Sequence, residues 1–136
     1  MTTPIHLQLC AGEHTIDARV ARTAEQRALG LMHRTELDPN EGMLFIHGQA
    51  DVLSYWMKDT PVPLSIAFLE DDGTIVHLAD LQPHSLEGCR CEQPVRYVLE
   101  MPQGWFAERG IGPGTRVTGP AFAVAATEGR PGPAPD

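Results

Sequence analysis

The sequence predicts an α+β domain built mainly from antiparallel strands, folded as a small, partly closed barrel or sandwich with two short helices. Two observations favour this fold. Segments in which apolar and polar residues alternate recur along the chain, and glycine, proline, asparagine or aspartate residues separate them. The chain also lacks the alternating strand–helix order and the glycine-rich phosphate motif of a dinucleotide-binding sheet.

The first predicted elements are a β-hairpin and a helix. Residues 5–9 and 15–21 alternate with a period of two and are separated by a turn that contains a glycine, which is typical of a hairpin. A helix is expected over residues 24–31, because Thr23 and Gln26 match the capping-box pattern and apolar residues repeat at helical spacing.

Two strands and a stiff linker are expected next. Turn-forming residues at 37–42 precede an apolar run at 43–46, which predicts a buried strand. A further strand is expected over residues 52–57. Pro61 and Pro63 then predict an extended linker, because proline restricts φ and lacks a backbone N–H.

The remaining segments predict a second hairpin, a strand, a helix and a last short strand. The hairpin covers residues 64–69 and 74–81, which a turn ending in glycine separates. A strand is expected over residues 96–101 and a short helix over residues 103–109, because a glycine follows that could end the helix. A proline–glycine turn then precedes a strand over residues 115–117.

Length and charge limit the classes of function. The 136 residues, 42% of them hydrophobic, suit one domain. We expect this domain over residues 1–118, followed by a flexible tail rich in proline, glycine and alanine over residues 119–136. A net charge of −8 argues against binding of nucleic acid. The sequence shows no membrane span and no secretion signal, so we expect a cytoplasmic protein, and it predicts no cofactor.

Trp56 and the only lysine, Lys58, lie in the segment that is richest in polar and aromatic side chains. Residues two apart on a strand point to the same face, so the Lys58 ammonium would lie beside the Trp56 indole. Such a pair can bind an anion, a sugar or a flat ligand. The alternatives are that Trp56 belongs to the core and that Lys58 pairs with a carboxylate.

Arg34 and Glu100 are two further charged candidates. Arg34 follows Met32 near the end of the predicted helix and either binds a carboxylate or lies on the surface. Glu100 shares one face of its strand with Val98, within an apolar run. Because burial of an unpaired charge is costly, we expect Glu100 to meet Lys58 or Arg34. The pair would be either structural or part of a site in which Glu100 is a general base.

His84, Cys89 and Cys91 form a candidate metal-binding group. A Cys-x-Cys pair with a histidine five residues earlier could hold a soft metal ion. The spacing differs from the paired Cys-x₂-Cys of structural zinc sites, so free or loop cysteines are the alternative. Three cysteines are also too few for a disulfide scaffold.

Four sequence blocks in this order resemble the domain-of-unknown-function family 192. They are residues 29–34 (LGLMHR), 42–45 (GMLF), 55–64 (YWMKDTPVPL) and 97–100 (YVLE) with Gly104. The resemblance covers about residues 16–117. Two positions depart from the family pattern, since the family usually has asparagine at Asp59 and often an acidic residue at Ser65. The resemblance implies a compact, β-rich single domain, relatives that often look exported, and no enzymatic activity.

The sequence leaves three functions open. The first is binding of a small polar ligand or a protein partner in a cleft lined by the face that carries Trp56 and Lys58. The candidate ligand-binding residues are Met32, Arg34, Trp56, Lys58, Asp59, Thr60 and Glu100. The second is a hydrolase-type enzyme acting on a polar small molecule, with Glu100 or His47 as the base. The third is a metal-binding protein that uses the cysteines and His84.

Overall fold

Strands dominate the part of the chain that the computed structural model describes, residues 5–122. In chain order, the elements of this part are β1 (Ile5–Ala11), β2 (His14–Ala21), α1 (Ala24–Leu29), β3 (Glu41–Asp51), β4 (Ser54–Tyr55), β5 (Leu64–Leu69), β6 (Ile75–Leu81), β7 (Cys89–Arg90), β8 (Val95–Pro102), α2 (Trp105–Glu108) and β9 (Val117–Thr118). The predicted α+β class with mainly antiparallel strands is confirmed.

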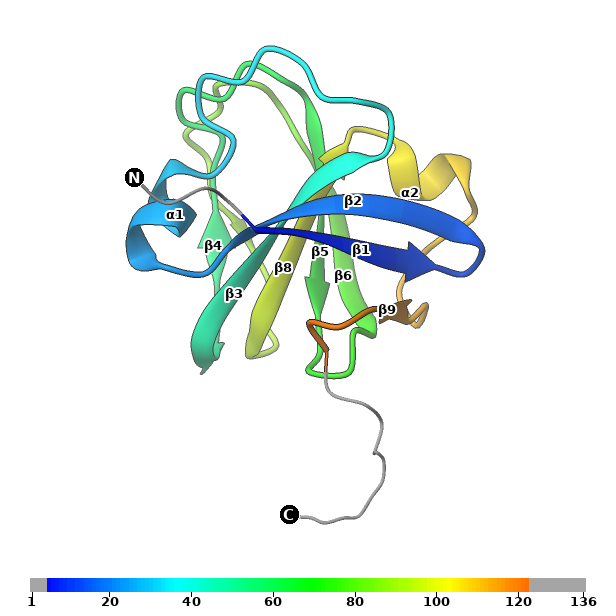
Figure 1. Ribbon diagram of the computed structural model, residues 1–136. Coiled ribbons are helices and arrows are strands. Elements are labelled where there is room, and N and C mark those ends of the chain that lie inside the picture. The colour runs from blue at the N-terminus through cyan, green and yellow to red at the C-terminus, as the bar shows by residue number, and fades with distance from the viewer. Residues whose placement is uncertain (1–4, 123–136) are drawn as a thin grey trace.

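The main sheet curls into a half-barrel (Figure 1). Its strand order is β6-β5-β8-β3-β2-β1-β9, and β4 and β7 form a separate ribbon. Neighbouring strands are antiparallel except β2 and β3, which run parallel. The two edges of the sheet meet at one end. There the Val117 N–H donates to the Gly73 carbonyl at 2.8 Å, and the Ile75 N–H donates to the Thr115 carbonyl at 2.9 Å. The predicted partly closed barrel is therefore confirmed.

The two predicted hairpins and the capping box are confirmed. β1 pairs with β2 from Ile5 opposite Val20 to Ala11 opposite His14, and β5 pairs with β6 along their whole length. At the start of α1, the Thr23 hydroxyl accepts the Gln26 N–H at 3.0 Å. The Gln26 side chain in turn accepts the Thr23 N–H at 3.1 Å. These local signals were sufficient because the stabilising partners lie a few residues apart.

The helices are shorter than predicted. α1 ends at Leu29 instead of residue 31, because Gly30 turns the chain with a φ of 51° and its N–H donates to the Gln26 carbonyl. α2 covers only Trp105–Glu108 within the predicted 103–109, since Gly104 precedes it with a φ of 88°. The expected glycine at its end, Gly110, has a φ of 69°, as a C-terminal glycine should.

The extents of β3 and β9 also differ from the prediction. β3 continues to Asp51 instead of ending at residue 46, because it resumes pairing with β8 after a register shift, where Asp51 lies opposite Val95. β9 covers Val117–Thr118 and not 115–117, since Thr115 hydrogen-bonds to β6 and only the next residues reach β1.

The segment at 52–57 departs most from the prediction. Only Ser54 and Tyr55 are in a strand, and they pair with β7. The Met57 N–H donates to the Ser85 carbonyl, and Asp59 has a φ of 53°, which turns the chain. A continuous strand from 52 to 57 is therefore wrong, because its only neighbouring strand, β7, is two residues long.

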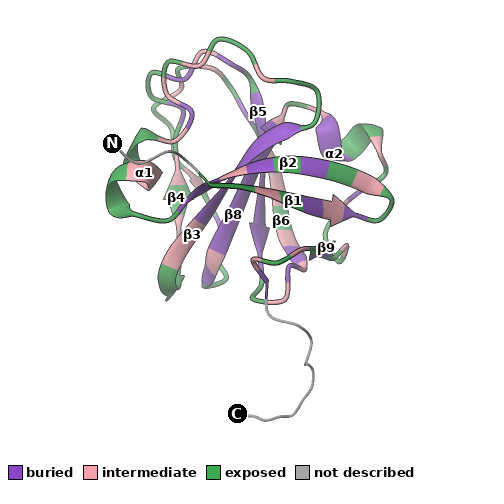
Figure 2. Ribbon diagram, viewed as in Figure 1, coloured by how far each residue is buried: buried purple, intermediate pink, exposed green. Residues whose placement is uncertain are grey.

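Two hydrophobic clusters cover the two faces of the sheet. On β8, Tyr97, Leu99 and Met101 belong to one cluster and Val98 to the other. Glu100 shares the face of Val98, as the alternation predicted. Figure 2 shows that β5 and β8 are buried along most of their length. Glu100 is therefore a carboxyl at the centre of a buried sheet.

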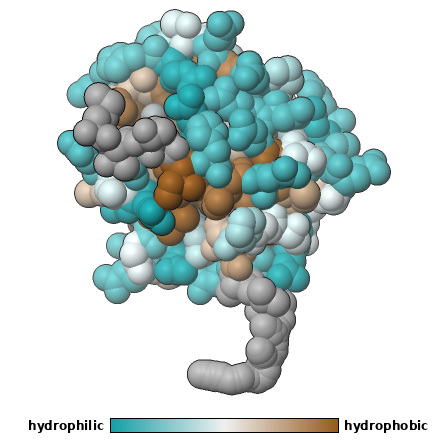
Figure 3. Space-filling view, in the orientation of Figure 1, coloured by the Kyte–Doolittle hydropathy of each residue, from teal (hydrophilic) through white to brown (hydrophobic). Residues whose placement is uncertain are grey.

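The chain still packs against the core after β9. The Phe122 ring is 5.1 Å from the Tyr97 ring, and the Tyr97 hydroxyl donates to the Ala121 carbonyl. The rest of the predicted tail, residues 123–136, lies outside the described residues. In the space-filling view of Figure 3, mostly hydrophilic residues surround an apolar area near the centre of this face. Between residues 5 and 122, neither helix is long and apolar enough to cross a lipid bilayer.

Candidate functional site

A cavity of about 270 Å³ lies between α1, β3 and the segment that contains β4. Residues from four parts of the chain contribute to its wall, including Met32, Phe45, Tyr55, Trp56 and Glu100. The main sheet fixes the positions of two of these residues, Phe45 and Glu100. Met43 lies opposite Glu100 and Phe45 lies opposite Val98 in the β3–β8 pair, so Phe45 and Glu100 point to the same face.

Glu100 is the most unusual group in this wall. It is only 4% exposed, and no hydrogen bond or ion pair reaches its side chain from the residues between 5 and 122. Burial raises the pKa of Glu100 from 4.5 to about 8. At neutral pH the carboxyl is therefore mostly protonated, and what exposure it retains is at the cavity that it lines.

The expected ion pair of Glu100 with Lys58 or Arg34 is wrong. Arg34 pairs instead with Glu41 at the start of β3. Lys58 lies in the turn after β4, with its Nζ 5.6 Å from the centre of the Trp56 ring. The prediction that Glu100 forms an ion pair considered only charge. The conformations of the loops that carry Arg34 and Lys58 determine which charged groups come together.

A hydrogen bond joins His47 and Tyr55, which both line the cavity. His47 Nε2 and the Tyr55 hydroxyl are 2.6 Å apart. Burial and the charge of Glu100 raise the pKa of Tyr55 well above its usual range, while burial and the charge of Arg27 lower the pKa of His47. Both groups are thus neutral at pH 7, and the tautomer of His47 sets which of the two donates the hydrogen bond.

The Tyr55 ring also packs edge-on against Phe45. The ring centres are 5.0 Å apart and the planes are inclined by 72°. This arrangement is favourable for aromatic pairs and gives the cavity a rigid wall. Of these three residues the sequence predicted only His47, as a candidate base, and neither Phe45 nor Tyr55 as part of a site. The ribbon that places Tyr55 opposite β3 depends on β7, which lies more than thirty residues further along the chain.

Trp56 and Lys58 are in contact, although not for the predicted reason. β4 ends at Tyr55, so neither residue lies in a strand and a shared strand face does not account for their proximity. The Thr60 hydroxyl donates to the Lys58 carbonyl at 3.0 Å, and the His33 N–H donates to the Asp59 carbonyl at 2.7 Å. Aspartate and asparagine both tolerate the positive φ at Asp59.

Four of the seven candidate ligand-binding residues line the cavity, namely Met32, Trp56, Thr60 and Glu100. Lys58 and Asp59 lie in the adjoining turn. Arg34 is not part of the cavity wall.

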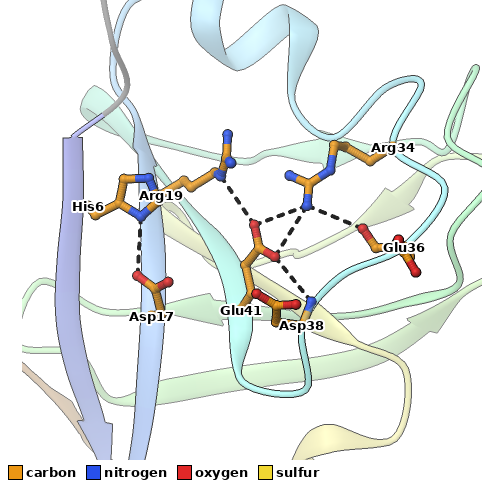
Figure 4. Close-up of polar contacts among 7 residues, drawn as sticks. All are labelled: His6, Asp17, Arg19, Arg34, Glu36, Asp38 and Glu41. Atoms are coloured by element: carbon orange, nitrogen blue, oxygen red, sulfur yellow. Dashed lines mark hydrogen bonds and ion pairs between the residues drawn. The ribbon is translucent and has the colours of Figure 1, made fainter.

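Arg34 instead belongs to a polar network around Glu41 (Figure 4). The Glu41 carboxylate accepts hydrogen bonds from Arg34 at 3.1 and 3.2 Å, from Arg19 at 3.2 Å and from the Asp38 N–H at 3.1 Å. Burial raises the pKa of Glu41, but the Asp38 N–H and the two arginines outweigh it and lower the pKa overall. This network ties the loop after α1 to Arg19 near the end of β2 and to Glu41 at the start of β3.

The candidate metal-binding group of His84, Cys89 and Cys91 is not assembled. Within the described range, no three histidine, cysteine, aspartate or glutamate side chains are grouped so as to hold a metal ion. Cys89 and Cys91 are free thiols, and burial, followed by the neighbouring Cys91, raises the pKa of Cys89. His84 lies in a loop with a φ of 64°.

These features define a small half-barrel domain with an aromatic cavity beside the first helix. The chain belongs to the family DUF192, described as an uncharacterized ACR, whose model matches residues 7–119. The resemblance noted in the sequence is confirmed.

Two solved structures share the fold and a third of the sequence. A Sinorhizobium meliloti protein, described provisionally as a transcription regulator, is 34% identical with a TM-score of 0.80, over 86% of this chain and 94% of that one. A protein of unknown function from Novosphingobium aromaticivorans is 32% identical with a TM-score of 0.77, over 85% of this chain and 84% of that one. No curated protein matches the chain.

Proposed function

We propose that this domain binds a small molecule in the cavity between α1, β3 and β4. The observation that carries this proposal is Glu100, a buried carboxyl with no protein partner among the described residues that lines an accessible cavity. A buried polar group without a partner costs about 1–3 kcal/mol, so such groups concentrate where a ligand or a reaction uses them.

The shape and composition of the cavity agree with a small ligand. Its volume of about 270 Å³ lies just below the range of roughly 300–1,000 Å³ that is usual for small-molecule sites. Its wall combines aromatic and aliphatic side chains with a few polar groups, as such sites do. Leu29 and Trp56 line it while remaining 56% and 49% exposed, which leaves apolar surface at its margin.

Regulation of transcription does not follow from the Sinorhizobium meliloti neighbour. The net charge of −8 opposes contact with DNA phosphates. Our proposal therefore concerns the cavity and not a nucleic-acid surface.

A second candidate is acid–base catalysis on a small polar substrate. The raised pKa of Glu100 favours it, since a carboxyl with a pKa of about 8 can donate a proton at neutral pH. Glu100 would then be the acid, and His47, whose pKa is lowered by burial, would be the base. Both side chains line the same cavity.

The experiment that tests small-molecule binding is an NMR screen of a fragment library against ¹⁵N-labelled protein. We expect hits to shift the amide signals of residues 30–32 and 54–57. Ala28→Trp should abolish these shifts, because Ala28 lines the cavity from the exposed side of α1. Ala24→Trp is the matched control, since Ala24 is exposed on the same helix but does not line the cavity. A library without hits at these amides would refute the proposal.

A further inference from the structure

Building on the proposed cavity function, we propose that its ligand carries a protonated amine, which pairs with Glu100 and packs against the rings of Phe45, Tyr55 and Trp56. The class of ligand is thus a small organic cation.

Glu100 is the only acidic side chain among the described residues of the cavity wall, and it lacks a counter-ion. The one arginine in the wall, Arg27, is engaged elsewhere. Its Nη1 donates to the Arg22 carbonyl at 2.7 Å and to the Ile46 carbonyl at 3.0 Å, which holds it against α1 and β3. A cationic ligand would supply the counter-ion that lets Glu100 ionise, whereas an anionic ligand would find no free cationic side chain among the described residues of the wall.

Two other polar side chains of the wall already have hydrogen-bond partners. The Tyr55 hydroxyl hydrogen-bonds to His47, and the Thr60 hydroxyl donates to the Lys58 carbonyl. Glu100 therefore offers a free carboxyl, which becomes a strong acceptor when it ionises opposite a cation. An ammonium group has three donors and no acceptor, so it complements this wall.

The aromatic side chains supply the second component of cation recognition. Phe45 and Tyr55 form the rigid edge-to-face pair described above, and Trp56 adds an indole at the margin. The Lys58 ammonium already lies 5.6 Å from the centre of that indole, so this ring accepts a cation in the present structure. Aromatic rings around an acidic group are a general means of binding ammonium ions.

Binding has a proton balance that can be measured. In the empty cavity the Glu100 carboxyl holds its proton at pH 7, whereas the amine is already protonated. Formation of the carboxylate–ammonium pair breaks the Glu100 O–H bond and releases that proton to the buffer, so nearly one proton leaves for each amine bound.

Neighbouring groups do not obscure this proton release. The titratable groups around Glu100 are His47 of β3, Tyr55 of β4 and Cys89 of β7, with the permanently charged Arg27 of α1. Burial lowers the pKa of His47 and raises the pKa of Tyr55 and of Cys89, so all three remain neutral between about pH 7 and 8.

The test uses three probes of one shape and different charge: cyclohexylammonium, cyclohexanol and cyclohexanecarboxylate. Each is titrated into the full chain at pH 7 by calorimetry, in two buffers that differ in ionisation enthalpy. We expect the amine to bind at least about tenfold more tightly than the alcohol and the carboxylate to bind most weakly. The difference in heat between the buffers should correspond to the release of nearly one proton.

Two variants test whether Glu100 is responsible for the binding of the amine. Glu100→Gln should reduce amine binding at least about tenfold and leave alcohol binding unchanged, whereas Glu13→Gln, in the exposed β1–β2 turn, should change neither. The proton release is measured on the unaltered protein, so the test does not depend on the folding of a variant.

Three results would overturn the amine inference while small-molecule binding stands. The first is equal binding of cyclohexanol and cyclohexylammonium at the cavity amides, and the second is amine binding without proton release. The third is failure of cyclohexylammonium to bind while other fragments still shift the cavity amides. Absence of any fragment from the cavity contradicts both proposals.

Discussion

Replacement of Glu100 by glutamine should stabilise the protein at alkaline pH and leave it almost unchanged at acidic pH. Glutamine has nearly the shape of protonated glutamate, so the exchange preserves packing while removing ionisation. In the folded chain the pKa of Glu100 is raised to about 8, whereas in the unfolded chain it returns to about 4.5. Between these values the folded state holds a proton that the unfolded state has lost.

The sign and size of the effect follow from this difference. Unfolding releases the proton, so the free energy of unfolding falls as pH rises from 4.5 to 8. One unit of pKa corresponds to 1.36 kcal/mol, so wild type should lose up to about 5 kcal/mol through this group by pH 9 and about 3 kcal/mol by pH 7. The glutamine variant does not suffer this loss.

The assay is urea unfolding of wild type and Glu100→Gln at pH 5, 7 and 9, in the presence of a reductant because the three cysteines are free. The difference between the two proteins should grow from near zero to several kcal/mol as pH rises. Contributions of other titrating groups cancel in that difference. Glu13→Gln, at an exposed turn, should show no such trend. A difference that stays constant from pH 5 to 9 would falsify the reasoning, because it would mean that Glu100 ionises as easily folded as unfolded.

Three further predictions concern the polar network, the sheet and the cavity margin. Glu41→Gln should cost about 1–3 kcal/mol at pH 7, because Arg34 and Arg19 lose their common partner. Since the pKa of Glu41 is lowered, this cost should shrink in urea unfolding below about pH 4; an equal cost at acidic pH would contradict the ion-pair explanation. Gly42→Ala should lower the thermal midpoint strongly, because a Cβ there meets the Glu100 carbonyl, and an unchanged midpoint would exclude this close approach. Trp56→Ala should change the free energy of unfolding by less than about 1 kcal/mol but weaken cyclohexylammonium binding several-fold; unaltered calorimetric affinity would remove Trp56 from the site.

Most of the fold could be predicted because its signals are local. Period-two alternation identified both hairpins, and the alternation within β8 correctly placed Val98 and Glu100 on one face. The capping box located the start of α1 because its two hydrogen bonds join residues three apart. Such features depend on neighbours in the chain, so they can be read without knowing the fold.

The segment around β4 could not be predicted in the same way. Tyr55 faces Phe45 because Ser54 and Tyr55 pair with residues 89–90, and the Met57 N–H binds the Ser85 carbonyl. The local pattern predicted a longer strand, since hydrophobic spacing does not reveal how long the neighbouring strand is. The parallel pairing of β2 with β3 is likewise a property of the whole sheet.

The sequence by itself determined the class of fold, the face of β8 that carries Glu100 and the segment in which Trp56 and Lys58 lie close together. Only the tertiary structure decided that Arg34 pairs with Glu41, that Glu100 has no partner among the described residues, and that an aromatic cavity opens beside it. The physical reason is that alternation and capping act over a few residues. Burial and charge compensation depend instead on which distant segments pack together, and that choice is made by the whole core.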